Sequence, residues 1–246
     1  MTNKSGRMKH VSITAGRQVS FYLAMEEHLA RRYPGQEFFF TWQVEPSVIF
    51  GRNQVAEQEV NLDYCRSHGI SVFRRKSGGG CVYADMGNVM LSMVIDCRQV
   101  GLGYNRFVTA LQLALRRMGV NAAVSGRNDL LVAPPSRDAA TEGRKVSGVA
   151  YYQLPGRSII HSTLLYDTDM QNMVGSITPP EAKLLSKGIK SVRQRVTLLK
   201  DYTGLTLPQV VDSLRQTLCR GQYVPTDEDM AEAERLEKEE YAVQWT

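Results

Sequence analysis

Apolar positions spaced three or four residues apart predict helices in the first half of the chain. One pattern covers residues 20–33 and ends at Pro34-Gly35, which cannot continue a helix. A second covers residues 104–118, with Gly119 as its stop. A shorter helix is predicted at 61–68, because its first residue is an asparagine, a good N-terminal cap.

Alternating or continuously apolar runs predict strands between these helices. The last part of the chain is helical in character, and its start signals are Thr178-Pro179-Pro180, Thr206 and Thr226, with Gly188 as a stop. Strands joined by short turns, with helices grouped at the start, middle and end, indicate an α+β fold whose mixed, largely antiparallel sheet is flanked by helices. The extended runs are 37–42, 46–52, 70–76, 81–85, 88–96, 129–133, 145–153 and 158–167.

Composition is that of an ordinary globular protein. The 246 residues are 43% hydrophobic and 22% charged, and we expect one domain over residues 1–246. The four cysteines are widely spaced, without a CxxC pair, so neither a zinc site nor a disulfide framework is expected and a reducing cytoplasm fits best. No apolar run reaches the length of about 18 residues that predicts a membrane span, and residues 1–16 lack the apolar stretch of a signal peptide.

The net charge of +5 conceals an asymmetry along the chain. Residues 225–246 contain eight acids and two bases, which leaves 28 bases and 17 acids, an excess of +11, in the rest. Such an excess favours an anionic partner, and a nucleotide, an acidic protein or a nucleic acid would each fit.

The segment RRKSGGGCVY, residues 74–83, carries the strongest chemical signal. Three consecutive glycines between two predicted strands permit positive φ, and they let an anion approach backbone N–H groups that bind phosphate or carboxylate oxygens. Three bases precede the glycines, and Ser77 adds a hydroxyl. The segment is not a Walker A loop, because the lysine comes before the glycines and no GK[ST] follows. It predicts an anion site, with a purely structural hairpin as the alternative.

Two later residues could carry chemistry, although each alone is ambiguous. Lys145 begins an extended stretch, where a lysine is either a solvated edge charge or a partly buried cation aimed at a phosphate. His161 lies in an apolar strand, which is typical of a core histidine. No second histidine or carboxylate lies at a spacing that predicts a metal site or a Ser-His-Asp triad.

Taken in order, seven segments resemble the lipoate-protein ligase family, which shares its catalytic fold with biotin-protein ligases and octanoyltransferases. They cover the chain almost from end to end, so their order is far more specific than one glycine loop. The segments are YLAMEEHL (22–29), VIFGRNQ (48–54), RRKSGGGCVYADMGN (74–88), GRNDLLV (126–132), GRKVSGVAY (143–151), HSTLL (161–165) and KGIKSVRQRVTLL (187–199).

The resemblance implies a two-step reaction. Lipoate and Mg-ATP give lipoyl-adenylate and pyrophosphate. The lipoyl group then passes to a lysine on a lipoyl domain of a 2-oxoacid dehydrogenase E2 subunit or on the H protein of glycine cleavage. ATP, Mg²⁺ and lipoate are therefore the implied cofactors and substrate, and neither a nucleic acid nor a membrane is an implied partner.

The resemblance also implies roles for single residues. Lys145 would be catalytic and contact the lipoate carboxylate and the α-phosphate, where a fixed ammonium offsets the repulsion between two anions. Ala84 departs from the family, in which a histidine usually precedes the aspartate matching Asp85, so one polar contact is missing or replaced. ATP and lipoyl-adenylate would be bound by Arg75, Ser77, Gly78, Gly79, Gly80, Cys81, Val82, Tyr83, Asn88, Asn128, Asp129 and Lys145, and the lipoyl chain by Glu26 and His161, with no metal held by protein ligands alone.

Two alternatives stay open. An octanoyltransferase of the same fold would need a catalytic cysteine near the lysine, but residues 126–166 contain none, and Cys81 is the only candidate. A nucleic-acid-binding module would explain the basic charge but not the ordered segments, and the basic clusters lack interleaved aromatics. The ending EYAVQWT resembles the close of the family's catalytic domain, so we expect the family's accessory domain to be absent and a separate accessory protein to be a candidate partner.

Overall fold

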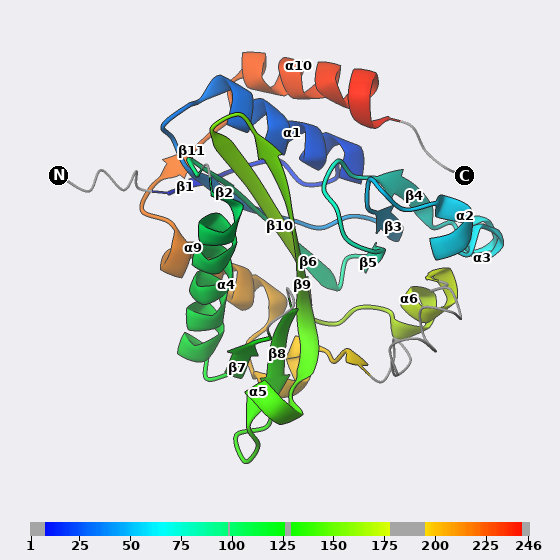
Figure 1. The fold of residues 1–246 in the computed structure, drawn as a ribbon, viewed down its shortest axis with the longest axis vertical. Coiled ribbons are helices and arrows are strands. Elements are labelled where there is room, and N and C mark those ends of the chain that lie inside the picture. The colour runs from blue at the N-terminus through cyan, green and yellow to red at the C-terminus, as the bar shows by residue number, and fades with distance from the viewer. Residues whose placement is uncertain (1–7, 98, 126–128, 178–194, 243–246) are drawn as a thin grey trace.

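The structure is a computed structural model, which describes residues 8–97, 99–125, 129–177 and 195–242. Its centre is a sheet with the strand order β11-β1-β2-β6-β10-β9-β8-β7 (Figure 1). β1 pairs in parallel with β2 and β11, and the remaining pairs are antiparallel. The strands are β1 (Lys9–Val11), β2 (Phe38–Trp42), β6 (Asn88–Ile95), β7 (Asn121–Val124), β8 (Asp129–Ala133), β9 (Arg144–Leu154), β10 (Arg157–Leu165) and β11 (Gln222–Tyr223).

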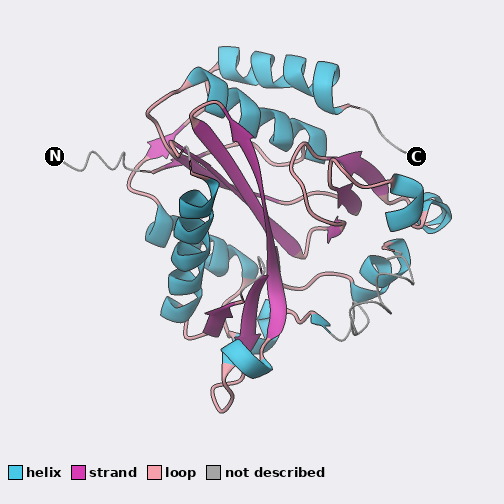
Figure 2. Ribbon diagram, viewed as in Figure 1, coloured by secondary structure: helices cyan, strands magenta, loops and turns pink. Residues whose placement is uncertain are grey.

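A smaller sheet lies beside the main one and has the order β4-β3-β5, formed by β3 (Ser47–Phe50), β4 (Ser71–Arg74) and β5 (Val82–Ala84). Helices surround both sheets (Figure 2). The helices are α1 (Val19–Arg32), α2 (Ala56–Glu59), α3 (Leu62–Ser67), α4 (Val100–Arg117), α5 (Ala139–Glu142), α6 (Met170–Ser176), the 3-10 turn η1 (Leu199–Tyr202), α9 (Leu207–Leu218), α10 (Asp227–Leu236) and the π-helical turn η2 (Glu237–Tyr241). The mixed, largely antiparallel α+β fold expected from the pattern is confirmed.

The main sheet is buried on both faces, which explains why its central strands carry apolar side chains on both sides. On β2, Phe39 packs toward α4 and α9, whereas Phe38 and Phe40 pack toward α1 and α10. β6 alternates in the same way, with Leu91 on the first side and Met90 on the second. Side chains that point to opposite faces of a strand thus enter two separate cores.

The main helices and strands agree with the pattern within a few residues, and the differences have local causes. α4 begins at Val100, four residues before the apolar pattern. Gly103 lets this first turn pack closely on the sheet, because a Cβ there would lie 3.1 Å from Ile95 and 3.4 Å from Ile160. The cap predicted at Asn61 is confirmed by its side chain accepting a hydrogen bond from the Tyr64 N–H at 3.1 Å.

The short strands β1, β7 and β11 were not predicted. β1 and β11 are held by pairing with strands that are distant in the sequence, whereas β7 pairs with the neighbouring β8. The signals at Thr178-Pro179-Pro180 and Gly188 lie outside the described residues. None of the described helices has the length and apolar content that a membrane crossing requires.

Candidate functional site

The glycine loop (residues 77–81), β9 and β10 meet at one cavity of about 260 Å³. This volume is slightly below the range of about 300–1,000 Å³ that is typical of small-molecule sites. The wall combines apolar side chains with a few polar ones. It is lined by Leu23, Ile49, Arg75, Gly79, Gly80, Cys81, Val82, Met90, Asp129, Lys145, Gly148, Val149, Ala150, His161, Ser162 and Thr163.

Arg75 organises the glycine loop, residues 77–81, from behind. Its Nη2 donates to the carbonyl oxygens of Gly78 and Gly80, both at 2.7 Å, and its Nη1 donates to the Ile49 carbonyl at 2.8 Å. A trans peptide directs its C=O and N–H to opposite sides. The N–H groups of Gly79 and Cys81 therefore point away from the guanidinium, and both residues line the cavity. Backbone N–H groups arranged in this way can bind an anion.

Close packing requires glycine at position 79 of the loop and at Gly51, which contacts the loop. Gly79 has φ +92°, in the left-handed region, and a Cβ there would lie 2.9 Å from Nη2 of Arg75. A Cβ on Gly51, at the end of β3, would lie 2.2 Å from the Gly79 carbonyl oxygen. Arg75 is 5% exposed, and burial lowers its pKa to about 10, so the guanidinium remains cationic at neutral pH.

Lys145 is the second residue of β9, and its side chain lines the cavity. Its Nζ lies 2.7 Å from Oδ1 of Asp129, and both side chains are about one third exposed. A bulge in the β8–β9 pairing puts Leu131 opposite Lys145 and Leu130 opposite Ser147. Bulges re-aim the side chains near them.

The backbone of Lys145 is also held from its other side, because the Thr197 N–H donates to its carbonyl oxygen at 2.9 Å. Its side chain passes over Gly148, where a Cβ would lie 2.8 Å from Nζ. The ammonium is thus positioned by its strand, by Asp129 and by the space above a glycine.

His161 connects the glycine loop to helix α1. Its Nε2 lies 2.6 Å from Oγ of Ser77, and its Nδ1 lies 3.0 Å from Oε2 of Glu26. All three residues are buried, with His161 6% exposed. The histidine therefore has partners on both ring nitrogens, from segments 84 and 135 residues away, which spacing along the chain could not indicate.

The structure brings most of the predicted site residues together, but not all of them line the cavity. Ser77, Gly78 and Glu26 lie behind the wall that Arg75 and His161 form. The Tyr83 ring packs in the core between the small sheet and α3. Asn88 joins two strands, since its Nδ2 donates to the Tyr83 carbonyl at 2.8 Å and its Oδ1 accepts from Leu164 N–H at 3.2 Å. Asn128 lies outside the described residues.

Several lining residues had no signal in the sequence. Gly148 belongs to a segment singled out for its lysine, and its spacing of three from Lys145 was the available hint. The apolar members face the cavity only because strands from different parts of the chain meet there. They are Leu23, Ile49, Met90, Val149 and Ala150, joined by Ser162 and Thr163.

Ala84, which departs from the family pattern, is fully buried in the core beneath α1. The neighbouring Asp85 accepts the Gly87 N–H at 2.9 Å and the Asp169 N–H at 2.8 Å. Burial raises the pKa of Asp85, and these backbone hydrogen bonds oppose the rise. Asp85 thus fixes two turns and does not line the cavity.

Lys76, at the start of the loop, is held by the end of the described chain. Its Nζ lies 2.7 Å from Oε2 of the buried Glu27, also pairs with Glu240, and lies 4.5 Å from the centre of the Tyr241 ring. Burial alone would lower the pKa of Lys76, but the hydrogen bonds to Glu240 and Glu27 outweigh burial and raise it. The Lys76 ammonium is therefore paired with carboxylates of the protein itself.

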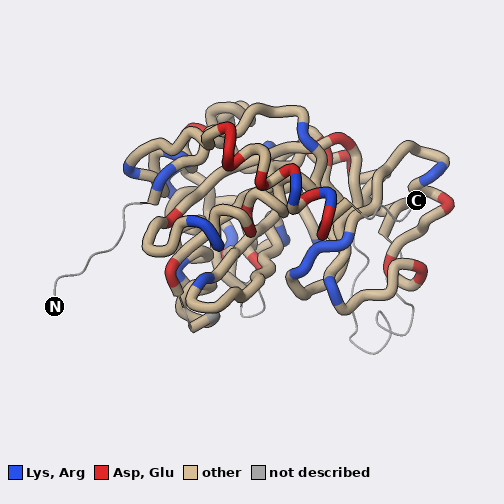
Figure 3. The backbone as a smooth tube through the Cα atoms, turned by 90° about the horizontal axis from the view of Figure 1, so that it is seen from above, with Lys and Arg blue, Asp and Glu red and all other residues tan. Residues whose placement is uncertain are grey.

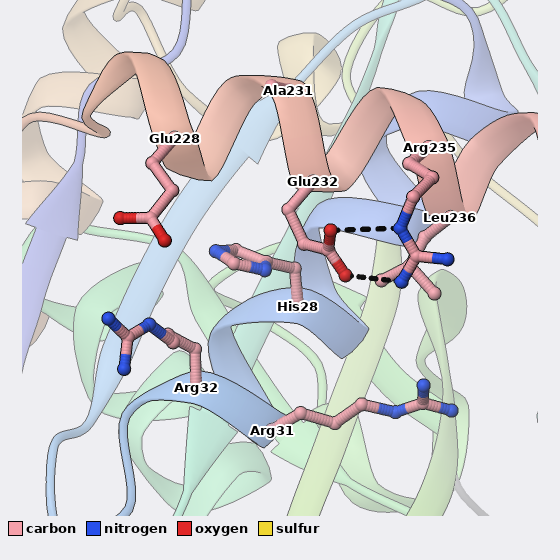
Figure 4. A pocket seen from close by; sticks show the side chains of 8 residues that line it. All are labelled: His28, Arg31, Arg32, Glu228, Ala231, Glu232, Arg235 and Leu236. Atoms are coloured by element: carbon pink, nitrogen blue, oxygen red, sulfur yellow. Dashed lines mark hydrogen bonds and ion pairs between the residues drawn. The ribbon is translucent and has the colours of Figure 1, made fainter.

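A second hollow, of about 480 Å³, lies between α1 and α10. Figure 4 shows His28 directed from α1 toward α10, with Arg31 and Arg32 on the α1 side. Opposite them, Glu232 accepts two hydrogen bonds from Arg235, at 2.6 and 2.9 Å. His28 contacts Oδ1 of the buried Asp229 at 2.7 Å. The predicted site residues do not line this hollow, and its contacts join two helices.

The acidic segment near the C-terminus neutralises part of the basic excess. Glu234 pairs with Arg17 at 2.9 Å, and Glu240 pairs with Lys76. Seen from the α10 side, basic and acidic positions are interleaved (Figure 3). The excess upstream of residue 225 is therefore not wholly available to an external anion.

Of the four cysteines, Cys65 and Cys219 are buried and Cys81 and Cys97 are partly exposed, and none of them forms a disulfide within the described residues. Burial raises the pKa of Cys65 to about 11. Within the described residues, no three His, Cys, Asp or Glu side chains are grouped as a metal site would require.

Comparisons with known proteins identify relatives of this arrangement. A family model described as "Lipoyl protein ligase A/B catalytic domain" matches residues 18–219. Lipoate-protein ligase 1 of Staphylococcus aureus is 33% identical over 95% of this chain and 71% of its own length. A bipartite lipoate protein ligase of Thermoplasma acidophilum, solved in a study that includes its E2 lipoyl domain, has a TM-score of 0.82 at 26% identity and covers 97% of this chain and 94% of its own. A lipoate-protein ligase A bound with ATP has a TM-score of 0.79 at 26% identity, with 97% and 96% covered.

Proposed function

Because the chain belongs to the lipoyl protein ligase A/B catalytic-domain family, we propose that it is a lipoate-protein ligase. It activates lipoate with ATP to lipoyl-adenylate and transfers the lipoyl group to a specific lysine of an acceptor protein. The observation that carries the proposal is that Lys145 and the glycine loop line one cavity that also has an apolar wall. Lys145 and Gly79 are 66 residues apart in the sequence.

Lys145 is the proposed catalytic residue. In the first step a lipoate carboxylate oxygen attacks the α-phosphorus of ATP, the phosphoanhydride bond breaks, and pyrophosphate leaves with the bonding electrons. Two anions must meet for this step, and an ammonium already fixed beside them stabilises the charge that develops on phosphorus. The same ammonium polarises the acyl-phosphate when the acceptor lysine attacks the carbonyl carbon and AMP leaves.

The glycine loop is the proposed phosphate and carboxylate cradle. The N–H groups of Gly79 and Cys81 face away from Arg75, which holds the carbonyl groups of the same peptides. Arg75 acts here mainly through the loop, because its guanidinium is occupied by three carbonyl oxygens and by Oγ of Ser77. Asn128 is proposed to assist on the phosphate side.

The carboxylate of Asp129 is a suitable ligand for Mg²⁺ that is bound together with ATP. Mg²⁺ is usually bound by one or two carboxylates together with substrate phosphates and water, rather than by a full protein cage. Asp129 is a carboxylate beside Lys145 at the cavity, so it would contact the ion. When bound, the ion would neutralise phosphate charge.

The apolar wall suits the lipoyl chain. Leu23, Ile49, Val82, Met90 and Val149 line the cavity together with His161. Burying each methylene of an acyl chain contributes about 0.8 kcal/mol, so several such residues suffice to select an aliphatic acid.

The proposed acceptors are lipoyl domains of 2-oxoacid dehydrogenase E2 subunits or the H protein of glycine cleavage. The T. acidophilum relative, described together with its E2 lipoyl domain as one lipoylation system, supports the first class. That relative is bipartite, which supports a separate accessory protein as a further partner. We place the activity in the cytoplasm, where the acceptors' lysines and ATP are available.

Mass spectrometry of an acceptor domain tests the function. The domain is incubated with the protein and either lipoate plus Mg-ATP or presynthesised lipoyl-adenylate. We expect one lipoyl group to be added from lipoyl-adenylate, slower addition from lipoate plus Mg-ATP, and neither with Lys145→Ala. Absence of transfer from lipoyl-adenylate would refute the ligase assignment.

Acyl transfer through a cysteine is a second candidate, because Cys81 lines the cavity. An octanoyltransferase would first acylate this thiol from a preformed donor. Trapping a thioester on Cys81 with an octanoyl donor in the absence of ATP would favour this function over ligation.

A further inference from the structure

A continuous series of hydrogen bonds runs behind the cavity from β2 to the glycine loop. It crosses β6, α1 and β10, and its members are at most 6% exposed. The contacts, in order, are Trp42 Nε1 to Ser92 Oγ (2.8 Å), Ser92 Oγ to Glu26 Oε1, Glu26 Oε2 to His161 Nδ1 (3.0 Å), His161 Nε2 to Ser77 Oγ (2.6 Å) and Ser77 Oγ to Arg75 Nε (2.9 Å).

The two ends of the series determine the direction of every bond. The indole N–H of Trp42 and the Nε–H of Arg75 can only donate. Each serine that accepts one of them therefore donates its own proton onward, so Ser92 donates to Glu26 and Ser77 donates to His161. Nε2 of His161 is consequently an acceptor, and its Nδ1–H donates to the Glu26 carboxylate.

The alternative, a doubly protonated His161, does not fit these contacts. Its Nε2–H would donate to Ser77 Oγ, which already accepts from the Arg75 cation. The Ser77 proton would then have no acceptor, because Ser77 Oγ has no third hydrogen-bond partner in the described part of the chain. A buried donor without an acceptor is costly.

We propose that Glu26, Ser92 and Trp42 are positioning residues that hold His161 as the neutral Nδ1–H tautomer, and that His161 in turn orients Ser77 and Arg75 beneath the glycine loop. The tautomer of a histidine is set by the hydrogen bond that its other nitrogen makes. Ser77 and Arg75 then keep the carbonyl groups of Gly78 and Gly80 turned away from the ligand. Only the activity measurement below rests on the proposed ligase function.

The tautomer is measured directly by NMR on the full chain labelled with ¹⁵N-histidine. The chain has four histidines, and the His161 signals are assigned as those lost in His161→Gln. At pH 7.5 we expect His161 to carry its proton on Nδ1 and to leave Nε2 unprotonated. An Nε2–H tautomer or an imidazolium would overturn the proposal, whatever the enzyme's activity.

Ser92→Ala tests the far end of the series, because it removes the hydroxyl between Trp42 and Glu26. We expect the single His161 tautomer to be lost and KM for lipoyl-adenylate to rise about tenfold, with kcat changing less. Ser92→Thr keeps a hydroxyl and should restore both readouts. The matched control is Thr168→Val, which removes a buried hydroxyl that has no hydrogen-bond partner among the described residues, and it should behave as wild type.

The outcomes separate this proposal from the ligase assignment. A wild-type tautomer and KM in Ser92→Ala would refute the positioning role. A protein without lipoyl transfer whose His161 nevertheless carries the Nδ1 proton would refute the function and leave the hydrogen-bond assignment standing. If Ser92→Ala does not fold, the wild-type spectrum decides alone.

Discussion

Gly148→Ala separates positioning of Lys145, the proposed catalytic residue, from stability of the fold. The added Cβ would lie 2.8 Å from Nζ and 3.0 Å from Cε of Lys145. Ordinary carbon contacts are about 3.5–4.0 Å, so the ammonium must move by roughly 0.7 Å or more. Displacing a catalytic group by about 1 Å can lower the rate about 100-fold, so we expect kcat to fall by about 10- to 100-fold, or about 1.4–2.7 kcal/mol.

We expect Gly148→Ala to lower the activity without lowering the thermal stability of the fold. Gly148 is not among the glycines with positive φ, and the atoms that its Cβ would meet belong to the end of a flexible side chain. An alanine in an accessible conformation commonly stabilises a protein by about 0.4–1 kcal/mol through the unfolded state. We therefore expect an equal or higher Tm. Gly204→Ala, where a Cβ would meet open space, is the matched control for both measurements.

The assay is single-turnover transfer from lipoyl-adenylate to an acceptor domain, combined with thermal unfolding. If Gly148→Ala acts through the lysine, it should add no further loss in a Lys145→Ala background, because both changes then remove one interaction. A wild-type rate in Gly148→Ala would refute the reasoning, and so would a rate loss that only accompanies a lower Tm.

Three further predictions concern the thiols, the loop and the α1–α10 contact. Changing all four cysteines to serine should preserve ATP-dependent ligation, because Lys145 and the loop amides remain; loss of ligation with an intact fold would favour the Cys81 mechanism. Gly79→Ala should lower the free energy of unfolding by about 1–2 kcal/mol, since an L-residue at φ +92° is strained, and should raise KM for lipoyl-adenylate. Gly78→Ala, which has space for a Cβ and no positive φ, should cost less stability in urea titrations, and equal losses would contradict this account. Burial alone would raise the pKa of Asp229, but hydrogen bonds from His28, Tyr223, Thr226 and Tyr33 outweigh burial and hold that pKa below its usual range. The stability from this carboxylate should be fully present above the unfolded pKa of about 3.9 and be lost as the pH falls below it, so Asp229→Asn should flatten the acid side of the stability curve, and an unchanged curve would exclude the role.

The parts of the fold that the sequence pattern predicts are those with a local cause. α1 is ended by Pro34-Gly35, and the cap at Asn61 satisfies the Tyr64 N–H within its own helix. β1 and β11 lack such a cause, because each is only two or three residues long; β11 pairs with β1, and β1 also pairs with β2. Such strands exist only once distant segments have met.

The candidate site shows the same division. The glycine loop could be singled out because its residue types and spacing carry chemistry. Lys145 was ambiguous by itself, and only the resemblance to the ligase family indicated a catalytic role for it. The role of Arg75 could not be predicted, since a base beside glycines suggests contact with an anion, whereas this guanidinium binds carbonyl groups of its own loop. His161 was typical of a core residue by itself, and its partners Ser77 and Glu26 are brought to it only by the sheet and by α1.

The attachment of Lys76 to Glu27, Glu240 and Tyr241 has a consequence for the order of events during synthesis. Lys76 and Glu240 are 164 positions apart, and Glu27 and Tyr241 are 214 apart. Protein chains are made from the N-terminus at about 5–20 residues per second, so the glycine loop leaves the ribosome many seconds before the turn that secures it. During that interval Glu27 lacks the Tyr241 hydroxyl and Lys76 lacks one of its carboxylates. A nascent chain can thus form β4 and β5 early, but the contacts that secure Lys76 beside the glycine loop are complete only after residue 241 has emerged.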